Sequence, residues 1–207
     1  MMRIGIDFDN TIVSYDTLFH KVAVEQGAVP QGTSPTKLAV RDHLRAIGRE
    51  EVWTEMQGYV YGARMEGATA YPGVLEFLRW GRDRGLALSV ISHKTRYPFL
   101  GPQYDLHEAA RNWVSSHLKD TGGPLVPPES VFFELTKEEK VRRIEAMGCD
   151  YYVDDLPEIL LASDFPAGTG RILFDPEAHH ERSGSIVHAR SWVAILSYFR
   201  RLCPKVR

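Results

Sequence analysis

The chain has 207 residues, of which 43% are hydrophobic, and its formal net charge is −2. This length allows one buried core with room for an insertion, and the near-neutral charge gives no sign of attraction to nucleic acid or to a membrane surface. No run approaches the length of a membrane span, and Asp7 comes too early for an apolar signal core. Cys149 and Cys203 show no metal-type spacing, so we expect free thiols and a cytoplasmic location.

Short apolar runs without strict polar alternation are predicted to be strands buried on both faces of a parallel sheet. In chain order they are residues 3–6, 86–91, 130–135, 151–153 and 171–174. Helical patterns lie between and after these runs, at about 72–84, 106–118, 136–147, from 157 onward and 190–202. Thr136 and Glu139 have the form of a capping box at the start of one helix. This alternation predicts a doubly wound α/β fold with a parallel sheet.

The segment 15–70 breaks the alternation of strands and helices. It holds no convincing strand, only helical segments separated by Gly and Pro, and Ser34-Pro35 has the residues to cap and begin one helix. Because it follows the first strand directly, we expect a small helical insertion that covers the sheet edge where ligands bind in open α/β folds. The predicted domains are a core of residues 1–14 and 71–207 and an all-helical insertion of residues 15–70.

The most informative stretch is the end of the first apolar run, where Asp7 and Asp9 are separated by one residue. Residues i and i+2 of an extended segment point the same way, so these two acids would repel each other unless a cation, a bound proton or a sharp turn separated them. A strand that runs into an Asx turn is the alternative without chemistry. The pair indicates a catalytic or cation-binding site once other polar groups reach the same place.

Other chemistry-bearing residues follow the predicted strands in the same way. Ser92 ends the run 86–91, an acidic pair ends 151–153, and Lys140 lies in the first turn of the helix after 130–135. Ligands of open parallel sheets bind outside the carboxyl ends of the strands. We therefore expect one edge to gather Asp7, Asp9, Ser92, Lys140, Asp154 and Asp155.

Phosphoryl transfer with a hard cation is the chemistry that suits these groups. Clustered carboxylates without nearby His or Cys ligands favour Mg²⁺, which takes oxygen ligands and relieves the repulsion among acids. One carboxylate can then attack a phosphate as nucleophile, and a second can protonate the leaving oxygen. A lysine and a hydroxyl can hold the equatorial oxygens, where charge accumulates.

With these motifs in order, the chain resembles the haloacid dehalogenase (HAD) superfamily of phosphatases. Its first motif, an apolar strand followed by Asp-x-Asp-x-Thr, matches Ile4 to Thr11, and its second matches Leu88 to Ser92. The lysine of the third motif matches Lys140, and the acidic pair of the fourth matches Asp154-Asp155. The resemblance covers residues 1 to about 192 and implies a Rossmann-like core with a small helical cap of the C1 type.

The resemblance also implies a role for each matching residue. Asp7 matches the nucleophile that becomes aspartyl phosphate, and Asp9 matches the general acid/base, whose backbone carbonyl also binds Mg²⁺. Asp154 matches a further metal ligand, and Asp155 acts on the metal directly or through water. Ser92 and Lys140 match the groups that hold the substrate phosphate. Asn10 replaces the commoner glycine, but Asn tolerates left-handed backbone geometry.

Three alternatives stay open in the sequence. Lys137 rivals Lys140 for the phosphate-holding lysine. The number of residues between Lys140 and Asp154 is typical of similar phosphatases, so the resemblance favours Lys140. His93 follows Ser92 as a further candidate for binding the substrate phosphate, or it begins a loop. Two other groups are interpreted as structural: a solvated basic stripe in the insertion and a polar loop without a metal. These are Lys37, Arg41, Arg45 and Arg49, and His179-His180-Glu181.

The predicted function is a Mg²⁺-dependent phosphatase that hydrolyses a small phosphorylated metabolite, such as a sugar phosphate or nucleotide, through aspartyl phosphate. The predicted partner is that substrate, with no nucleic acid polymer and no membrane. A phosphomutase with the same acids is the rival within the enzymes. A non-catalytic domain of this fold is the rival outside them, although such a domain would be expected to lose Asp7 or Asp9. The sequence does not indicate an oligomeric state.

Overall fold

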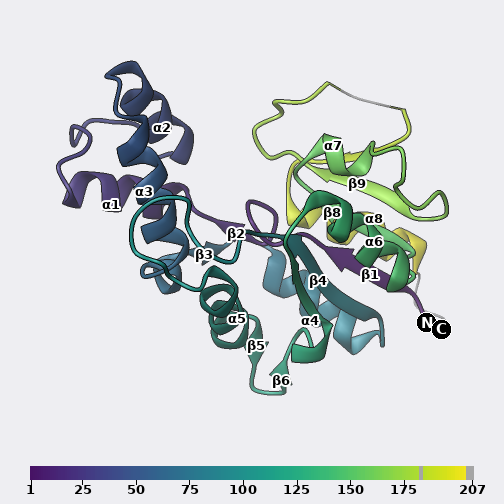
Figure 1. Ribbon diagram of the computed structural model, residues 1–207. Helices are drawn as coiled ribbons and strands as arrows, with labels where there is room; N and C mark the ends of the chain where they lie inside the picture. The colour runs from purple at the N-terminus through teal and green to yellow at the C-terminus, as the bar shows by residue number, and fades with distance from the viewer. Residues whose placement is uncertain (182–183, 204–207) are drawn as a thin grey trace. The chain divides into compact units, whose positions relative to one another are not determined.

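The computed structural model describes residues 1–181 and 184–203 and divides into a core unit and a helical unit (Figure 1). The core unit comprises Met1–Ile12, Ala70–His93 and Leu118–Arg207. Its sheet has six strands in the order β10-β9-β8-β1-β4-β7, and every neighbouring pair is parallel. The strands are β1 (Arg3–Ile6), β4 (Ala87–His93), β7 (Val131–Glu134), β8 (Tyr151–Asp154), β9 (Gly170–Phe174) and β10 (Val187–Ala189). The predicted α/β fold with a parallel sheet is confirmed.

The strand order reverses between β1 and β8. From β1 the chain proceeds outward through β4 to β7, then returns to β8 beside β1 and proceeds outward the other way. Such a switch point leaves a crevice at the carboxyl ends of the two central strands, which is where open α/β sheets bind ligands. Asp7 follows β1 and Asp154 ends β8, so the acids lie at this switch point.

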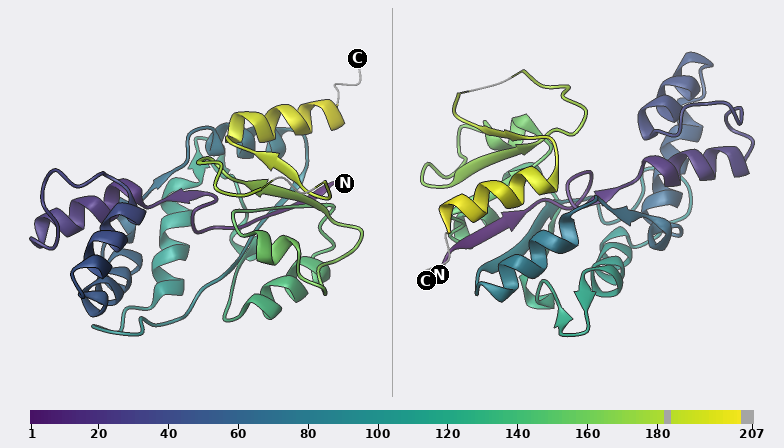
Figure 2. Two further views of the ribbon diagram at one scale, coloured as in Figure 1. Left: turned by 90° about the horizontal axis from the view of Figure 1, so that it is seen from above. Right: turned by 180° about the vertical axis from the view of Figure 1, so that it is seen from behind.

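Helices cover both faces of the core sheet (Figure 2). Leu88 packs under α4 (Val74–Asp83) at Gly81, whereas Ile91 belongs to a buried cluster with Val141 and Ile144 of α6 (Lys137–Ala146). Because Leu88 and Ile91 are an odd number of residues apart on β4, they point to opposite faces. α4 shares its face with α8 (Trp192–Leu202) through ring contacts of Phe77, and α6 shares the other with α7 (Pro157–Leu160).

The helical unit is larger than the expected insertion of residues 15–70, because it joins Val13–Thr69 to a second segment, Lys94–His117. The Trp113 indole donates a 2.9 Å hydrogen bond to the Ala68 carbonyl, and Gly58 and Gly62 leave room for Pro98 and Tyr104. These contacts between distant segments are not readable from helix periodicity. The helices are α1 (Asp16–Glu25), α2 (Lys37–Ala46), α3 (Glu50–Tyr61), the 3₁₀ helix η1 (Met65–Gly67) and α5 (Leu106–His117).

Some local predictions were wrong. Ser34-Pro35 does not begin a helix: Thr36 caps α2, its hydroxyl accepting from the Ala39 amide, while Asp16 accepts from the Lys37 amide. β10 was not predicted from the sequence, because it is only three residues long. Two short two-stranded sheets were not predicted either, and one strand of the first lies in the segment 15–70, which was predicted to lack strands. They are β2 (Val13–Ser14) with β3 (Thr69–Ala70), and β5 (Lys119–Asp120) with β6 (Gly123–Pro124).

The capping box at the start of α6 is confirmed. The Thr136 hydroxyl accepts from the Glu139 amide at 3.1 Å, and the Glu139 carboxylate accepts from the Thr136 amide at 3.2 Å. Thr136→Ala removes the acceptor for one amide of the first turn, so we expect unfolding free energy to fall by about 1 kcal/mol. Urea denaturation measures this, with Thr136→Ser, which keeps the hydroxyl, as the matched control. Equal stability of the Ala and Ser variants would contradict a capping contribution.

Candidate active site

Lys140 lies at the centre of a buried ionic cluster. Its side chain is 0% exposed, and its Nζ lies 2.6 Å from Asp7 Oδ1 and 2.7 Å from Asp154 Oδ2. The Tyr152 ring lies below the ammonium, 5.7 Å away, and its hydroxyl donates to the Ile91 carbonyl. A fully buried cation between two carboxylates costs much solvation, which only close pairing offsets. The fold therefore holds these three groups together at fixed distances.

The face of the sheet explains why these three residues meet. A Cβ at Gly5 would lie 2.7 Å from the Tyr152 ring and 2.9 Å from the Cys149 sulfur, so Gly5 faces the cluster under α6. Side chains two residues apart on a strand share a face, so Asp7 follows Gly5 and Asp154 follows Tyr152 on this side. The Asp7 amide still donates to the Val153 carbonyl at 2.8 Å, which keeps Asp7 on the ladder.

The two rival lysines are in different environments. Lys137 is exposed and pairs with the exposed Glu158 at 3.0 Å, whereas Lys140 faces the sheet one helical turn later. The capping box fixes where α6 begins, and thereby which of the two points inward. Lys140 is the lysine that the structure brings to the acids.

Burial and mutual repulsion disturb the acids strongly. Burial raises the pKa of Asp154, an effect that Lys140 opposes and Asp7 reinforces. Burial likewise raises the pKa of Asp155, with further increases from the charges of Asp7 and Asp154. Burial alone would lower the pKa of Lys140, but Asp154 and Asp7 outweigh it and raise this pKa above its usual range. Asp154 and Asp155 therefore keep their protons to a higher pH than exposed aspartates do.

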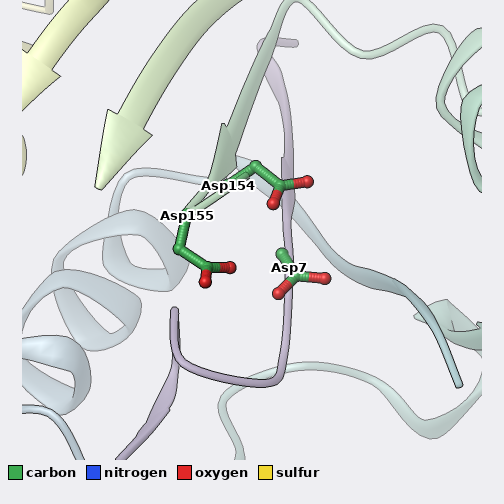
Figure 3. Close-up of side chains that lie close together, drawn as sticks. All are labelled: Asp7, Asp154 and Asp155. Carbon is green, nitrogen blue, oxygen red and sulfur yellow. The ribbon is translucent and has the colours of Figure 1, made fainter. Parts of the chain in front are cut away.

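Asp7, Asp154 and Asp155 fit a divalent cation (Figure 3). Each offers a carboxylate oxygen, and these three oxygens all lie within 4.8 Å of one another. The three possible metal ligands are all carboxylate oxygens, the ligand type that a hard cation prefers. The Thr11 hydroxyl donates to Asp155 Oδ1 at 3.2 Å, and the Leu156 amide donates to Asp154 Oδ1 at 3.0 Å, so two of the acids are also oriented.

The loop after β1 separates Asp9 from this group of three acids. Asn10 has a φ of 59°, the left-handed geometry expected to be tolerable at this position. Asp9 is half-buried, and its side chain is not part of the three-oxygen group. The Thr11 carbonyl accepts from the Trp192 indole at 2.9 Å, which fixes the far side of the loop. No site role was predicted for Thr11 or Trp192 from the sequence, because their partners are distant in the chain.

Ser92 and His93 end β4 beside β1, but neither is bonded to the ionic cluster. The Ser92 side chain is buried and, by strand alternation, lies on the face opposite Ile91. His93 is half-buried, and among the described residues its Nδ1 has no hydrogen-bond partner. The structure thus brings both residues to the predicted edge without joining them to the cluster.

The groups interpreted as structural lie away from the acids in sequence and have their own partners. Arg41 pairs with Asp42, and Arg45 pairs with Glu50, both at exposed positions. The backbone amides of His179 and His180 donate to the Asp175 carboxylate, which orders a polar loop. Cys149 and Cys203 are free thiols. No helix in the described ranges is long and apolar enough to cross a membrane.

The core is a parallel α/β sheet with a buried lysine and three carboxylates at its switch point. It therefore belongs to the broad class of doubly wound α/β folds with an acidic site suited to a cation. No family model matches the chain, and no curated protein matches it. Solved structures do match over nearly the full length of both chains. The chain has the fold of the HAD superfamily, as the sequence resemblance implied.

Three of these structural neighbours illustrate the likeness. A HAD-superfamily hydrolase from Ehrlichia chaffeensis has a TM-score of 0.55 at 12% identity, covering 98% of each chain. A β-phosphoglucomutase from Pyrococcus sp. strain ST 04 has a TM-score of 0.57 at 12% identity, covering 99% of this chain and 100% of its own. A HAD phosphatase from Thermococcus onnurineus has a TM-score of 0.51 at 16% identity, covering 99% of this chain and 98% of its own. At such identities the likeness is one of fold.

Proposed function

We propose that this protein is a Mg²⁺-dependent phosphatase that hydrolyses small phosphate monoesters through an aspartyl-phosphate intermediate on Asp7. The observation that carries the proposal is the Lys140 ammonium, 0% exposed and held 2.6 Å from Asp7 and 2.7 Å from Asp154. A fixed cation beside a carboxylate lets an anionic phosphate approach and stabilises charge that develops during transfer. The fold shared with HAD hydrolases and phosphatases supports the same reading.

The proposed chemistry has two steps. An Asp7 carboxylate oxygen attacks phosphorus, the bond from phosphorus to the ester oxygen breaks, and Asp9 gives its proton to the departing alcohol. Asp9 then takes a proton from water, whose oxygen attacks phosphorus and releases inorganic phosphate and the Asp7 carboxylate. Lys140 holds the phosphoryl oxygens. Mg²⁺, held by the Asp7, Asp154 and Asp155 carboxylates and the Asp9 carbonyl, would supply positive charge to the transferring group.

A phosphomutase is the second candidate, because the same residues can return the phosphate to a substrate, and one of the structural neighbours is a β-phosphoglucomutase. The two differ in the fate of the phosphoryl group. A mutase requires a bisphosphate or phosphoenzyme to start its cycle and releases little inorganic phosphate. A phosphatase releases one phosphate for each ester consumed.

The test is phosphate release from p-nitrophenyl phosphate and from a panel of sugar phosphates and nucleotides. We expect stoichiometric release with Mg²⁺, none with EDTA, and recovery when excess Mg²⁺ is restored. Isomerised sugar phosphate without free phosphate would support the mutase. Absence of both reactions across the panel would contradict an enzymatic role and favour a binding domain. We also propose that the protein is cytoplasmic.

Asp9→Asn tests the proton-transfer role separately from cation binding. The proposed metal contact of Asp9 is its backbone carbonyl, which the substitution retains, whereas its proton is lost. We expect the Mg²⁺ affinity, measured by calorimetry, to stay within about threefold while turnover falls by roughly 10²- to 10⁴-fold, the usual contribution of a general acid/base. Unchanged turnover would remove Asp9 from this role.

A further inference from the structure

His93 lies on the same face of the sheet as the ionic cluster. Ile91, two residues before it on β4, is buried among Val141 and Ile144 of α6. Because residues two apart on a strand point to the same side, His93 also faces the α6 side, where Lys140 lies. Three neighbouring strands therefore present His93, Asp7 and Asp154 toward one face.

His93 lies further out along the strand direction than Asp7. The β1–β4 register pairs Ile6 with Val90, so Asp7 is level with Ile91 and His93 is two residues beyond. At roughly 3.3 Å per residue, the offset is about 7 Å toward the carboxyl ends. A phosphoryl group attacked by Asp7 would lie between the level of Asp7 and the level of His93 along the strands. The His93 imidazole is thus level with the alcohol part of an ester rather than with the nucleophile.

The His93 ring lacks a hydrogen bond that its burial demands. Its Nδ1 is buried and has no partner among the described residues, and such an atom costs free energy until a ligand or water satisfies it. Burial and the nearby Lys140 ammonium lower the pKa of His93, although Asp7 and Asp9 oppose this. The imidazole is therefore neutral near pH 7, with one nitrogen as donor and the other as acceptor.

We propose that His93 Nδ1 hydrogen-bonds a hydroxyl group on the alcohol part of the substrate, so that the protein selects phosphate esters of small hydroxylated molecules. This rests on the phosphatase function proposed above. A hydroxyl suits either tautomer, because it both donates and accepts. His93 is thereby a specificity residue for the alcohol rather than a holder of the phosphoryl oxygens.

The test compares glycerol 2-phosphate, which has hydroxyls beside the ester, with p-nitrophenyl phosphate, which has none. His93→Leu removes the polar atom with a similar volume, and His93→Asn keeps an amide near the place of Nδ1. We expect the kcat/KM ratio of glycerol 2-phosphate to p-nitrophenyl phosphate to fall about tenfold in His93→Leu and to stay within about threefold in His93→Asn. An unchanged ratio in His93→Leu would overturn the proposal.

A binding measurement covers the case in which His93→Leu folds poorly or turnover is absent. With Asp7→Asn, which keeps substrate intact, the ¹⁵N resonance of His93 Nδ1 should shift on adding glycerol 2-phosphate and Mg²⁺ and shift much less with inorganic phosphate. Equal shifts with glycerol 2-phosphate and inorganic phosphate would show that Nδ1 contacts the phosphoryl group. No shift with either ligand would show that Nδ1 does not contact the substrate. Each of these two outcomes would overturn the proposal. If the wild-type protein hydrolyses neither ester, the phosphatase function fails separately.

Discussion

Asp7→Asn is expected to abolish phosphate release, by about 10⁴-fold or more, as removal of a nucleophile does in other covalent catalysts. The amide has no negative charge with which to attack phosphorus, and it cannot form an acyl phosphate. It also removes one of the two carboxylates that pair with Lys140. Initial rates with p-nitrophenyl phosphate and Mg²⁺ measure the loss, and acid quenching with mass spectrometry should detect phosphorylated protein only when Asp7 is present.

Asp150→Asn is the matched control for this experiment. Asp150 accepts a 2.7 Å hydrogen bond from the Arg3 amide at the opposite, amino end of the central strands, so the same chemical change there leaves the site untouched. We expect its turnover within twofold of wild type. Turnover that survives in Asp7→Asn, or falls equally in both variants, would contradict nucleophilic attack by Asp7.

The sheet was predictable because its strands carry their own signal. The runs at residues 3–6 and 151–153 are mostly apolar, short and without polar alternation, as two-sided burial requires, and the structure pairs them as neighbours. β10 contributes a single branched apolar residue, Val187, and gave no comparable signal. Parallel pairing also implied that residues at strand ends meet, which placed Asp7 beside Asp154 before any distance was known.

The contacts that complete the site could not be predicted in this way. Thr11 reaches Asp155 across 144 residues, and Trp192 reaches the Thr11 carbonyl across 181 residues. Neither partner is marked by local periodicity, because packing of distant elements decides it. The same holds for Lys94–His117, which joins the helical unit through close contacts at Gly58 and Gly62 rather than through chain order.

The starts of helices α6 and α2 also show where prediction from local sequence succeeds and where it fails. Thr136 caps α6 as predicted, since its own side chain and that of Glu139 complete the motif within four residues. At α2, Ser34-Pro35 has equally good residues, but Asp16 from another helix accepts the Lys37 amide and helps move the start to Thr36. Local signals prevail where no distant partner competes.

Lys140→Met should impair both catalysis and folding. The substitution keeps a long apolar stem but removes the ammonium between Asp7 and Asp154, and losing one such fixed charge slows transfer by about a hundredfold or more. It also leaves buried carboxylates without their cation, which costs about 3–5 kcal/mol of unfolding free energy. Turnover with Mg²⁺ and urea denaturation in EDTA measure the two effects.

The stability loss should depend on pH in a defined direction. Lys140 lowers the pKa of Asp154, which burial already raises, so the Met variant binds a proton there still more tightly when folded than when unfolded. Stability from such a group is lost as pH rises, so the deficit should be larger at about pH 8 than at about pH 5.5. Lys137→Met is the matched control: its ammonium pairs with Glu158 in solvent, and we expect a change within about 0.5 kcal/mol and no pH trend. A pH-independent deficit in Lys140→Met, or an equal one in Lys137→Met, would show that the ammonium does not stabilise the acids.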